Sequence, residues 1–328
     1  MFTRSNKVIV VTGGAGFVGS NLVKKINHQG LYQVVIVDQY EEKRFGNLLG
    51  LSFVDYLSYH KGLEYLEQEM NKYQIAAILH IGANADVLVK DAAIMMHDNY
   101  DHSRFYLHYC QQHAIPFVYA SSAAVYGNSS RCLVSSKFEH PHNTYGWSKW
   151  IFDQHVKHNL SNFKGKVIGL RFFNVFGNGE SHKGKNASLP HRFYKFIQET
   201  GTIELFDEDI RRDYVWVNDV TQVIMEVLND PTVANGIYNL GTGHAITHHD
   251  LAQLVADIFI ESGIKSAEAI RIIKIPLPDT LVNNFQFYTQ AEQLPEFVKK
   301  NTSISTEKIK NYLCEMIAQE YKGHVPVN

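Results

Sequence analysis

The chain is poor in cysteine and contains no long apolar run, and each shortage excludes a class of protein. Its three cysteines, Cys110, Cys132 and Cys314, are widely separated and odd in number, which suits neither a disulfide framework nor paired zinc ligands. The apolar run Val8–Val11 is too short for a membrane span or a signal-peptide core. We therefore expect a soluble, cytoplasmic protein that does not bind to membranes.

An excess of charge of either sign is also missing. Lys and Arg number 31 against 33 Asp and Glu, which gives a formal net charge of −2. A charge this small provides no overall field for gathering nucleic acid, so we expect no nucleic-acid partner and infer that any anionic ligand is bound by local groups. The 17 histidines form no compact cluster of ligands in the sequence, and we predict no metal site.

What the sequence does contain is a regular alternation of short apolar runs and helix-length segments. A chain of 328 residues with 45% hydrophobic content can bury a substantial core. Such alternation forces parallel pairing with right-handed crossovers, so we predict an α/β fold with a doubly wound parallel sheet of the Rossmann type. Strands are predicted at Lys7–Thr12, Gln33–Val37, Ala76–His80, Pro116–Ala120 and Lys166–Phe172, and helices at Phe17–His28, Ile94–His113 and Gly146–His158.

The regular alternation of predicted strands and helices ends after Phe173. A polar, glycine-containing loop follows at Gly177–Gly184, and the later segments are shorter and interrupted by prolines. We predict a dinucleotide-binding domain over residues 1–173 and a smaller C-terminal α/β substrate lobe over residues 174–328. The two units are expected to exchange segments.

A glycine motif lies between the first predicted strand and helix. Gly13, Gly16 and Gly19 follow the strand directly, and Asp38 closes the second strand 19 residues later. The first glycine permits a tight turn, the second lets the backbone approach a pyrophosphate, and the third lets helix and strand pack closely. This context predicts a dinucleotide-binding site.

The residues after the second strand leave the choice of dinucleotide open. A carboxylate in the position of Asp38 accepts hydrogen bonds from the adenosine ribose of NAD, whereas a nearby cation accommodates the 2′-phosphate of NADP. Lys43 and Arg44 follow within a few residues. They are equally compatible with a solvated loop. We expect NADP first, with NAD as the open alternative.

A tyrosine and a lysine stand four residues apart at the start of a predicted helix. Tyr145 and Lys149 would therefore lie one turn apart on the same face. A tyrosine is a poor base at neutral pH, but an ammonium held beside it favours the phenolate. Ser121 and Ser122 end a predicted strand at the carboxyl edge of the sheet, where ligands of open α/β folds bind. Together these residues predict acid–base chemistry beside the dinucleotide.

These elements resemble the extended short-chain dehydrogenase/reductase superfamily, in which Ser122, Tyr145 and Lys149 would be the catalytic triad. The resemblance implies that Asn99 and Lys149 approach the nicotinamide ribose and that Arg212 meets a nucleotide phosphate. An ion pair of Arg212 with Asp213 or Asp219 is the alternative. The segments that carry the resemblance are Ala120–Gly127, Arg171–Gly177, Arg212–Val220 and Tyr238–Gly243.

A narrower resemblance rests on the His-Lys-Gly sequence at residues 182–184, together with residues 95–100, 108–110 and 285–291. These segments resemble the ADP-L-glycero-D-manno-heptose 6-epimerases, which supply heptose for lipopolysaccharide. The resemblance implies a second acid/base group at Lys183, facing Tyr145 across the sugar. Inverting a carbinol requires removing a hydride to NAD(P)+ and returning it to the other face of the ketone. Because the oxygen then points to the opposite wall, a second proton donor is needed there.

The resemblance also implies a set of binding residues and a homo-oligomer, either a ring such as a pentamer or a dimer. The substrate would be a nucleotide sugar, with ADP-heptose expected first. The cofactor would contact Gly13, Gly16, Phe17, Val18, Gly19, Asp38, Gln39, Arg44, Ile81, Gly82, Ala83, Asn99, Tyr145, Lys149, Val175 and Lys183, and the substrate Ser122, Asn174, Lys185, Phe206, Asp207, Arg212 and Phe285.

Two other functions stay open. One is a different nucleotide-sugar epimerase, such as one acting at C4 of a UDP-hexose, although such an enzyme can rotate the sugar past a single tyrosine and does not require Lys183. The other is a non-catalytic dinucleotide-binding sensor, which would lack the set of Ser122, Tyr145 and Lys149. A 4,6-dehydratase is disfavoured because Ala123 and Ala124 stand where that group has an acid pair.

Overall fold

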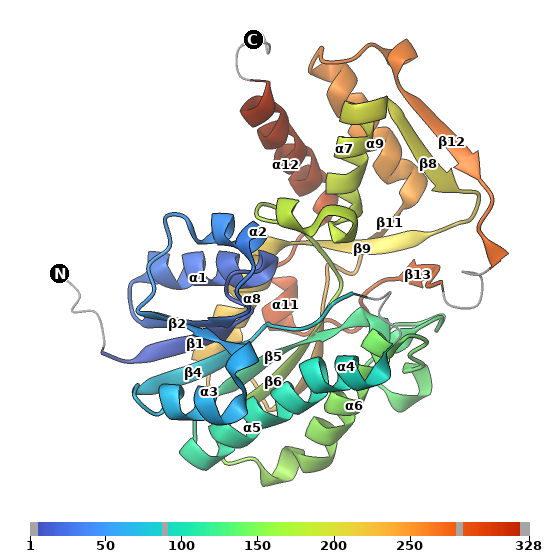
Figure 1. The fold of residues 1–328 in the computed structure, drawn as a ribbon. Coiled ribbons are helices and arrows are strands. Elements are labelled where there is room, and N and C mark those ends of the chain that lie inside the picture. The colour runs from blue at the N-terminus through green and yellow to red at the C-terminus, as the bar shows by residue number, and fades with distance from the viewer. Residues whose placement is uncertain (1–5, 87–90, 280–284, 322–328) are drawn as a thin grey trace.

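The computed structural model describes residues 6–86, 91–279 and 285–321, and its largest element is a seven-stranded parallel sheet (Figure 1). The strand order is β10-β6-β5-β4-β1-β2-β3, and every neighbouring pair is parallel. This confirms the predicted doubly wound sheet. The strands are β1 (Val8–Thr12), β2 (Gln33–Asp38), β3 (Asp55–Ser58), β4 (Ile75–His80), β5 (Phe117–Ser122), β6 (Val167–Phe172) and β10 (Gly236–Leu240).

Alternate residues of the central strands face two separate layers of helices. Ile9 and Val11 of β1 pack in one apolar cluster with α1 (Phe17–Gln29), α8 (Val217–Asn229) and α11 (Glu296–Lys299). Val8 and Val10 pack in the other cluster. Both faces of the sheet are therefore buried, which explains why the sequences of these strands are continuous apolar runs. The second layer contains α3 (Leu63–Met70), α5 (His102–His113) and α6 (Thr144–Asn159).

A second region covers the carboxyl end of the sheet, above it in Figure 1. It has its own apolar cluster, to which Phe193, Phe259 and Leu313 contribute. One small sheet joins β7 (Asn174–Phe176), β9 (Arg211–Trp216), β11 (Ala245–Thr247) and β13 (Tyr288–Thr289), another joins β8 (Thr202–Phe206) and β12 (Arg271–Ile275), and the helices are α7 (Leu189–Thr200), α9 (His248–Glu261) and α12 (Ser305–Glu320).

Parts of the C-terminal half return to the large sheet. Strand β10 pairs with β6 along its whole length, and α8 and α11 pack on the sheet beside α1. The boundary at residue 173 stays a prediction. Among the described residues, no helix has the length and apolar character needed to cross a membrane.

Two short helices lie close to the site described below. Helix α2 (Glu42–Phe45) follows β2, and α4 (Ala92–Met96) continues into a π-helical turn at His97–Asp101 before α5 begins. The sequence predicted one helix from Ile94 to His113. The structure instead widens this helix at one turn, a feature that is frequent at functional sites.

Candidate active site

The glycine loop has the close contacts that its spacing predicts. Gly13 has a φ of +68°, and a Cβ there would lie 2.7 Å from the Cα of Gly82. A Cβ on Gly19 would lie 2.0 Å from the carbonyl oxygen of Gly13. Gly16 precedes α1 without a side-chain cap, and first-turn N–H groups of a helix have no intrahelical partner. The loop thus has the form of a cradle for phosphate groups.

Asp38 ends β2 next to this loop and is buried. Its Oδ2 accepts a hydrogen bond from the backbone N–H of Ala15 (2.9 Å), and its Oδ1 accepts one from that of Gln39 (2.8 Å). The guanidinium of Arg44 lies 3.1 Å from the same Oδ1. Burial raises the pKa of Asp38, and Arg44 opposes that rise. The carboxylate is fixed at the rim of the glycine loop.

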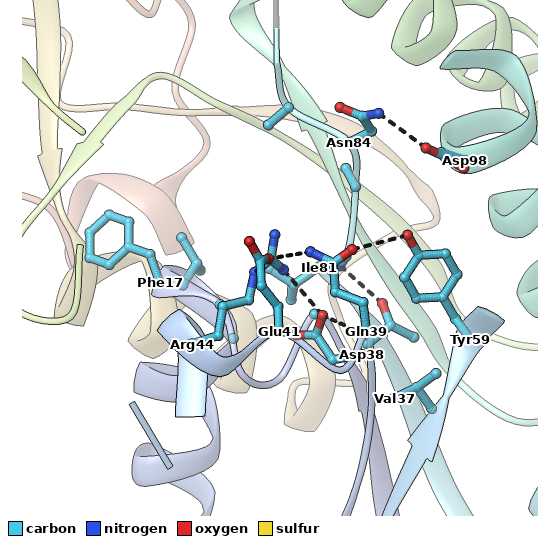
Figure 2. Close-up of a pocket in the computed structure, with 18 of the residues that line it drawn as sticks. Phe17, Val37, Asp38, Gln39, Glu41, Arg44, Tyr59, Ile81, Asn84 and Asp98 are labelled. Carbon is cyan, nitrogen blue, oxygen red and sulfur yellow. Dashed lines mark hydrogen bonds and ion pairs between the residues drawn. The ribbon is translucent and has the colours of Figure 1, made fainter. Parts of the chain in front are cut away.

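A cavity of about 520 Å³ opens between the glycine loop, the end of β2 and the segment after β4. Figure 2 shows Asp38, Gln39 and Arg44 beside Ile81, with Phe17 on one side and Tyr59 on the other. Asn99, Tyr145, Lys149 and Val175 are outside its lining. The predicted cofactor residues that do line it are Gly13, Gly16, Phe17, Val18, Gly19, Asp38, Gln39, Arg44, Ile81, Gly82, Ala83 and Lys183.

Thr12 and His80 line this cavity but were not predicted from the sequence. The hydroxyl oxygen of Thr12 accepts a hydrogen bond from the N–H of Gly82 (3.0 Å) and lies 2.7 Å from Nδ1 of His80. Nε2 of His80 lies 2.9 Å from the hydroxyl of Ser103. Burial lowers the pKa of His80 well below its ordinary value, so the ring is neutral. Thr12 and His80 both end strands at the carboxyl edge, a signal that could have identified them.

Tyr145 and Ser122 meet through a hydrogen bond between their side chains. Ser122 is the last residue of β5, and Tyr145 lies in the first turn of α6, whose cap Asn143 accepts from the N–H of Gly146 (2.7 Å). Burial raises the pKa of Tyr145, and the bond with Ser122 lowers it only in part. The phenol is therefore protonated at neutral pH in this structure, and Lys149 is not among the groups that shift its pKa.

Lys149 is buried one turn after Tyr145. Its Nζ donates to the backbone carbonyl of Ala120 (2.8 Å), which ties α6 to β5 beside Ser122. Burial lowers the pKa of Lys149 to about 8, and the carboxylate of Asp153 raises it in part. An ammonium that loses its proton near pH 8 can respond to a change of charge in the neighbouring site.

Asn99 lies in the π-helical turn and is buried. Its side-chain oxygen accepts from the N–H of Asn84 (2.8 Å), and its amide donates to the hydroxyl of Ser148 (2.9 Å). Asn84 in turn donates to Asp98 (3.0 Å) and lines the cavity. Asn99 thus joins the cavity wall to the helix that carries Tyr145 and Lys149.

A buried charge cluster lies behind β5. Arg171 contacts the carboxylates of Asp153 and Glu139, each at 2.8 Å, and all three side chains are fully buried. Asp153 also accepts hydrogen bonds from Ser121 and Tyr119, each at 2.9 Å. The cluster fixes the position of β5 relative to α6.

Lys183 projects from a 3₁₀ segment at Ser181–Asn186 into the cavity. Its Nζ lies 5.3 Å from the centre of the Phe17 ring. Burial lowers its pKa, and Glu180 partly opposes this. The buried carboxylate of Glu180 accepts hydrogen bonds from the N–H groups of Gly177 (3.1 Å) and Ser188 (2.6 Å), on both sides of this segment. Lys183 is therefore a partly buried lysine on an anchored segment.

Arg212 lies among aromatic rings and backbone carbonyls. Its guanidinium donates to the carbonyl oxygens of Phe287 (3.1 Å) and Gln286, and lies 5.7 Å from the centre of the Phe285 ring. The ring of Phe285 contacts that of Phe206 edge to face, with centroids 5.7 Å apart. The structure thus brings together three of the predicted substrate residues.

The alternative ion pairs of Arg212 are not formed within the described part of the chain. Asp213 instead accepts from Thr242, Gly243 and Ala291, and Asp219 pairs with Lys308 at 2.5 Å. Among the described residues the guanidinium of Arg212 therefore has no carboxylate partner, and it can bind another anion.

The other predicted substrate residues and Val175 make separate contacts. Asn174 donates to the carbonyl of Asp213 and to Thr289, both at 3.2 Å. Asp207 pairs with Lys274 at the surface (2.6 Å), and Lys185 is exposed. Val175 packs against the apolar cluster of β1.

Comparisons with known proteins agree with this geometry. A curated relative, the ADP-L-glycero-D-manno-heptose-6-epimerase of Alkalilimnicola ehrlichii, is 39% identical over 293 residues, which are 87% of this chain and 89% of that protein. The structure of the Helicobacter pylori enzyme of the same name superimposes with a TM-score of 0.80 at 26% identity, covering 95% of this chain and 97% of that chain. A Thermotoga maritima UDP-glucose 4-epimerase shares the fold, with a TM-score of 0.79 at 22% identity over 95% and 99% of the two chains.

The match to a family model covers the glycine loop and the acid–base residues. The model described as NAD dependent epimerase/dehydratase family matches residues 9–241. This range includes the glycine loop, Asp38, Tyr145 and Lys183. With the glycine cradle, the buried tyrosine and lysine, and a curated relative at 39% identity, the chain belongs to the NAD dependent epimerase/dehydratase family.

Proposed function

We propose that this protein is an isomerase that inverts C6 of ADP-L-glycero-D-manno-heptose. The observation that carries the proposal is Lys183, a lysine that lines the dinucleotide cavity and whose pKa is lowered by burial. The name of the Alkalilimnicola ehrlichii relative supports the same substrate. Supply of this sugar for lipopolysaccharide follows from that assignment.

The glycine cradle and Asp38 fit a nicotinamide dinucleotide. Gly16, Phe17 and Val18 would hold its pyrophosphate at the start of α1, and Asp38 its adenosine ribose. When bound, the dinucleotide supplies an acceptor that takes a hydride from the carbinol carbon and returns it to the other face. The residues of the chain then need only to bind the sugar and move the hydroxyl proton.

Tyr145 and Lys183 would divide the proton transfers between two positions. One of them removes the hydroxyl proton as the carbon is oxidised, and the other donates a proton to the oxygen as the carbon is reduced from the opposite face. Burial raises the pKa of Tyr145 and lowers that of Lys183, which favours a protonated phenol and a neutral amine. Each group would act as acid in one direction of the reaction and as base in the other.

Ser122 and Lys149 would assist from the same end of β5. The hydrogen bond between Ser122 and Tyr145 directs the phenol. The ammonium of Lys149, fixed on the carbonyl of Ala120, supplies positive charge beside the helix turn that carries Tyr145. Arg212 would bind the diphosphate of the nucleotide sugar, because its guanidinium has no carboxylate partner among the described residues and contacts Phe285.

The dinucleotide is NAD or NADP. NADP, the cofactor expected first, requires that Lys43 or Arg44 can reach a 2′-phosphate. NAD requires only a carboxylate for the ribose hydroxyls, which Asp38 provides. The ion pairs of Lys43 and Arg44 with Glu41 and Asp38 bear on the choice.

A UDP-hexose 4-epimerase is the second candidate, and a non-catalytic dinucleotide sensor is the third. The 4-epimerase neighbour shares the fold at 22% identity, but such an enzyme needs only one acid/base group, so it leaves Lys183 without a role. A sensor would need neither the Ser122–Tyr145 hydrogen bond nor Lys183 in the cavity.

The test is a substrate panel with one pair of variants. Purified protein is incubated with ADP-, GDP- and UDP-linked sugars, without added reductant, in ordinary and deuterated water. We expect epimerisation of the ADP-heptose without deuterium uptake at carbon. Lys183→Met should lower turnover by about a hundredfold or more, whereas the exposed control Lys24→Met should retain it. Full turnover in Lys183→Met would remove Lys183 from the mechanism, and turnover only of UDP-hexoses would favour the second candidate.

We also propose that the protein forms a homo-oligomer, as the sequence analysis predicts. A groove of about 820 Å³ on the outer side of α5 and α6 is lined by Phe105, His108 and His155. Its position is compatible with a contact between copies. Light scattering on the eluting protein measures the state directly, and a monomer at all concentrations would contradict it.

A further inference from the structure

Glu41 holds both cations that follow β2. One oxygen of its carboxylate lies 2.5 Å from Nζ of Lys43, and the other lies 2.6 Å from Nε of Arg44. The side chain of Gln39 donates to the latter oxygen. Figure 2 shows Glu41 between Arg44 and Gln39 at the wall of the cavity. Glu41 was absent from the residues predicted from the sequence.

Arg44 is held a second time by Asp38. Its Nη1 lies 3.1 Å from Oδ1 of that carboxylate. Two different nitrogens of one guanidinium therefore contact two different carboxylates. Arg44 is half-buried, so this pairing is less screened by solvent than an exposed ion pair.

The charge at the end of β2 is negative despite the two cations. Residues 38–44 contain Asp38, Glu41 and Glu42 against Lys43 and Arg44, a formal charge of −1. Burial raises the pKa of Glu41, but the hydrogen bond from Lys43 and the charge of Arg44 outweigh it, so its pKa is lowered and the group is ionised at neutral pH.

This arrangement opposes a 2′-phosphate. A phosphate monoester carries a charge of about −1.5 to −2 at neutral pH and binds best to a guanidinium whose N–H groups are free for bidentate contact. Here the phosphate would have to take Arg44 from two carboxylates and then remain near them. The ribose hydroxyls of NAD carry no charge and need no such rearrangement.

We propose that Glu41 is a specificity-determining residue that favours binding of NAD over NADP. Its ion pairs with Arg44 and Lys43 keep these two cations from binding the 2′-phosphate of NADP. The inference rests on the proposed function only in that the cavity binds a nicotinamide dinucleotide. It adds a residue whose removal should change which dinucleotide binds, without a change in the glycine cradle.

The experiment compares two neighbouring glutamates. Glu41→Gln and Glu42→Gln remove the same charge from neighbouring positions, the N-cap and the first residue of α2. Glu42 is exposed and is separate from the pairs described above. Dissociation constants of NAD+ and NADP+ are measured by calorimetry on the full chain. We expect Glu41→Gln to tighten NADP+ binding by about tenfold and to change NAD+ binding by less than about threefold. Glu42→Gln should change either constant by less than about twofold.

A double variant identifies the freed cation. In Glu41→Gln with Arg44→Gln, the gain in NADP+ affinity should fall back to within about threefold of the unaltered protein. Equal effects of the two single variants, or no gain in Glu41→Gln, would overturn the role of Glu41 while leaving dinucleotide binding intact. Failure of the unaltered protein to bind either dinucleotide would instead overturn the proposed function.

Discussion

The amide of Asn99 donates a hydrogen bond to the hydroxyl of Ser148 at 2.9 Å, and this bond joins the π-helical turn at the cavity to the helix that carries Tyr145 and Lys149. Ser148 also donates to the carbonyl of Tyr145 (2.8 Å). Asn99 and Ser148 are 49 residues apart in the chain. A hydroxyl outside the lining of the cavity therefore joins both sides of the site.

We expect Ser148→Ala to lower kcat more than it changes KM. Without the hydroxyl, Asn99 loses one partner and the first turn of α6 loses a restraint, so Tyr145 is less well aligned. Misalignment of this kind should lower kcat by about tenfold while KM for the sugar stays within about threefold. Steady-state kinetics on the nucleotide sugar measures the split. A proportional rise in KM with unchanged kcat would show that Ser148 acts in binding instead.

Lys149 should make the folded protein more stable as the pH rises. Its pKa is about 8 in the folded state against an ordinary value of 10.5, so between these two pH values the unfolded chain binds more protons and the free energy of unfolding increases with pH. Below about pH 8 the buried ammonium costs about 3 kcal/mol. Replacing it by Met removes this dependence.

The corresponding measurement is urea unfolding of the unaltered protein and Lys149→Met at pH 7 and pH 9.5. The stability of the variant relative to the unaltered protein should be higher at pH 7 than at pH 9.5, even though the variant has lost turnover. Equal differences at the two pH values would mean that the lysine is not perturbed by burial.

Replacing Asp153 should lower the free energy of unfolding by several kcal/mol. Replacing it by Ala leaves the fully buried guanidinium of Arg171 with one carboxylate fewer, and loss of one partner of a buried ion pair costs about 3 to 5 kcal/mol. The exposed pair of Asp209 and Arg211 provides the control, because Asp209→Ala should leave the free energy of unfolding nearly unchanged. Similar effects of both variants in chemical denaturation would contradict the importance of burial.

Arg212 and its neighbour Arg211 should differ sharply in substrate binding. Arg212 contacts Phe285 and the carbonyl of Phe287, whereas Arg211 pairs with Asp209 at the surface. We expect Arg212→Gln to raise KM for the nucleotide sugar by about tenfold or more and Arg211→Gln to leave it within about twofold. A bare nucleotide diphosphate used as a competitive inhibitor should lose affinity in parallel. If the inhibitor binds equally well to both variants, the diphosphate is bound elsewhere.

The parts of the fold that could be predicted from the sequence are those whose causes are local. Strand β1 is visible because both of its faces are buried, and the turn that follows is visible because Gly13 and Gly19 have no room for a side chain. Strand β3 (Asp55–Ser58) was missed, since it is short, lies at the edge of the sheet and carries polar residues.

The site was predictable where a motif sets the spacing and unpredictable where distant segments meet. The Tyr145 and Lys149 pair follows from one helix turn, and Asp38 follows from the end of one strand. Glu41 could not be predicted in this way, because its role depends on the ion pair that it forms with the Arg44 side chain in the folded structure. The contact of Phe206 with Phe285 joins residues 79 positions apart and depends on tertiary packing.

The pairing of β10 with β6 also has a consequence for how the chain is made. Until residue 240 has left the ribosome, the edge of β6 has no partner, and the apolar side chains of Ile168 and Leu170 lack part of their cover. A nascent chain that ends near residue 173 would therefore expose an open strand edge, which is a site for aggregation. The large sheet is therefore complete only after β10 has been synthesised.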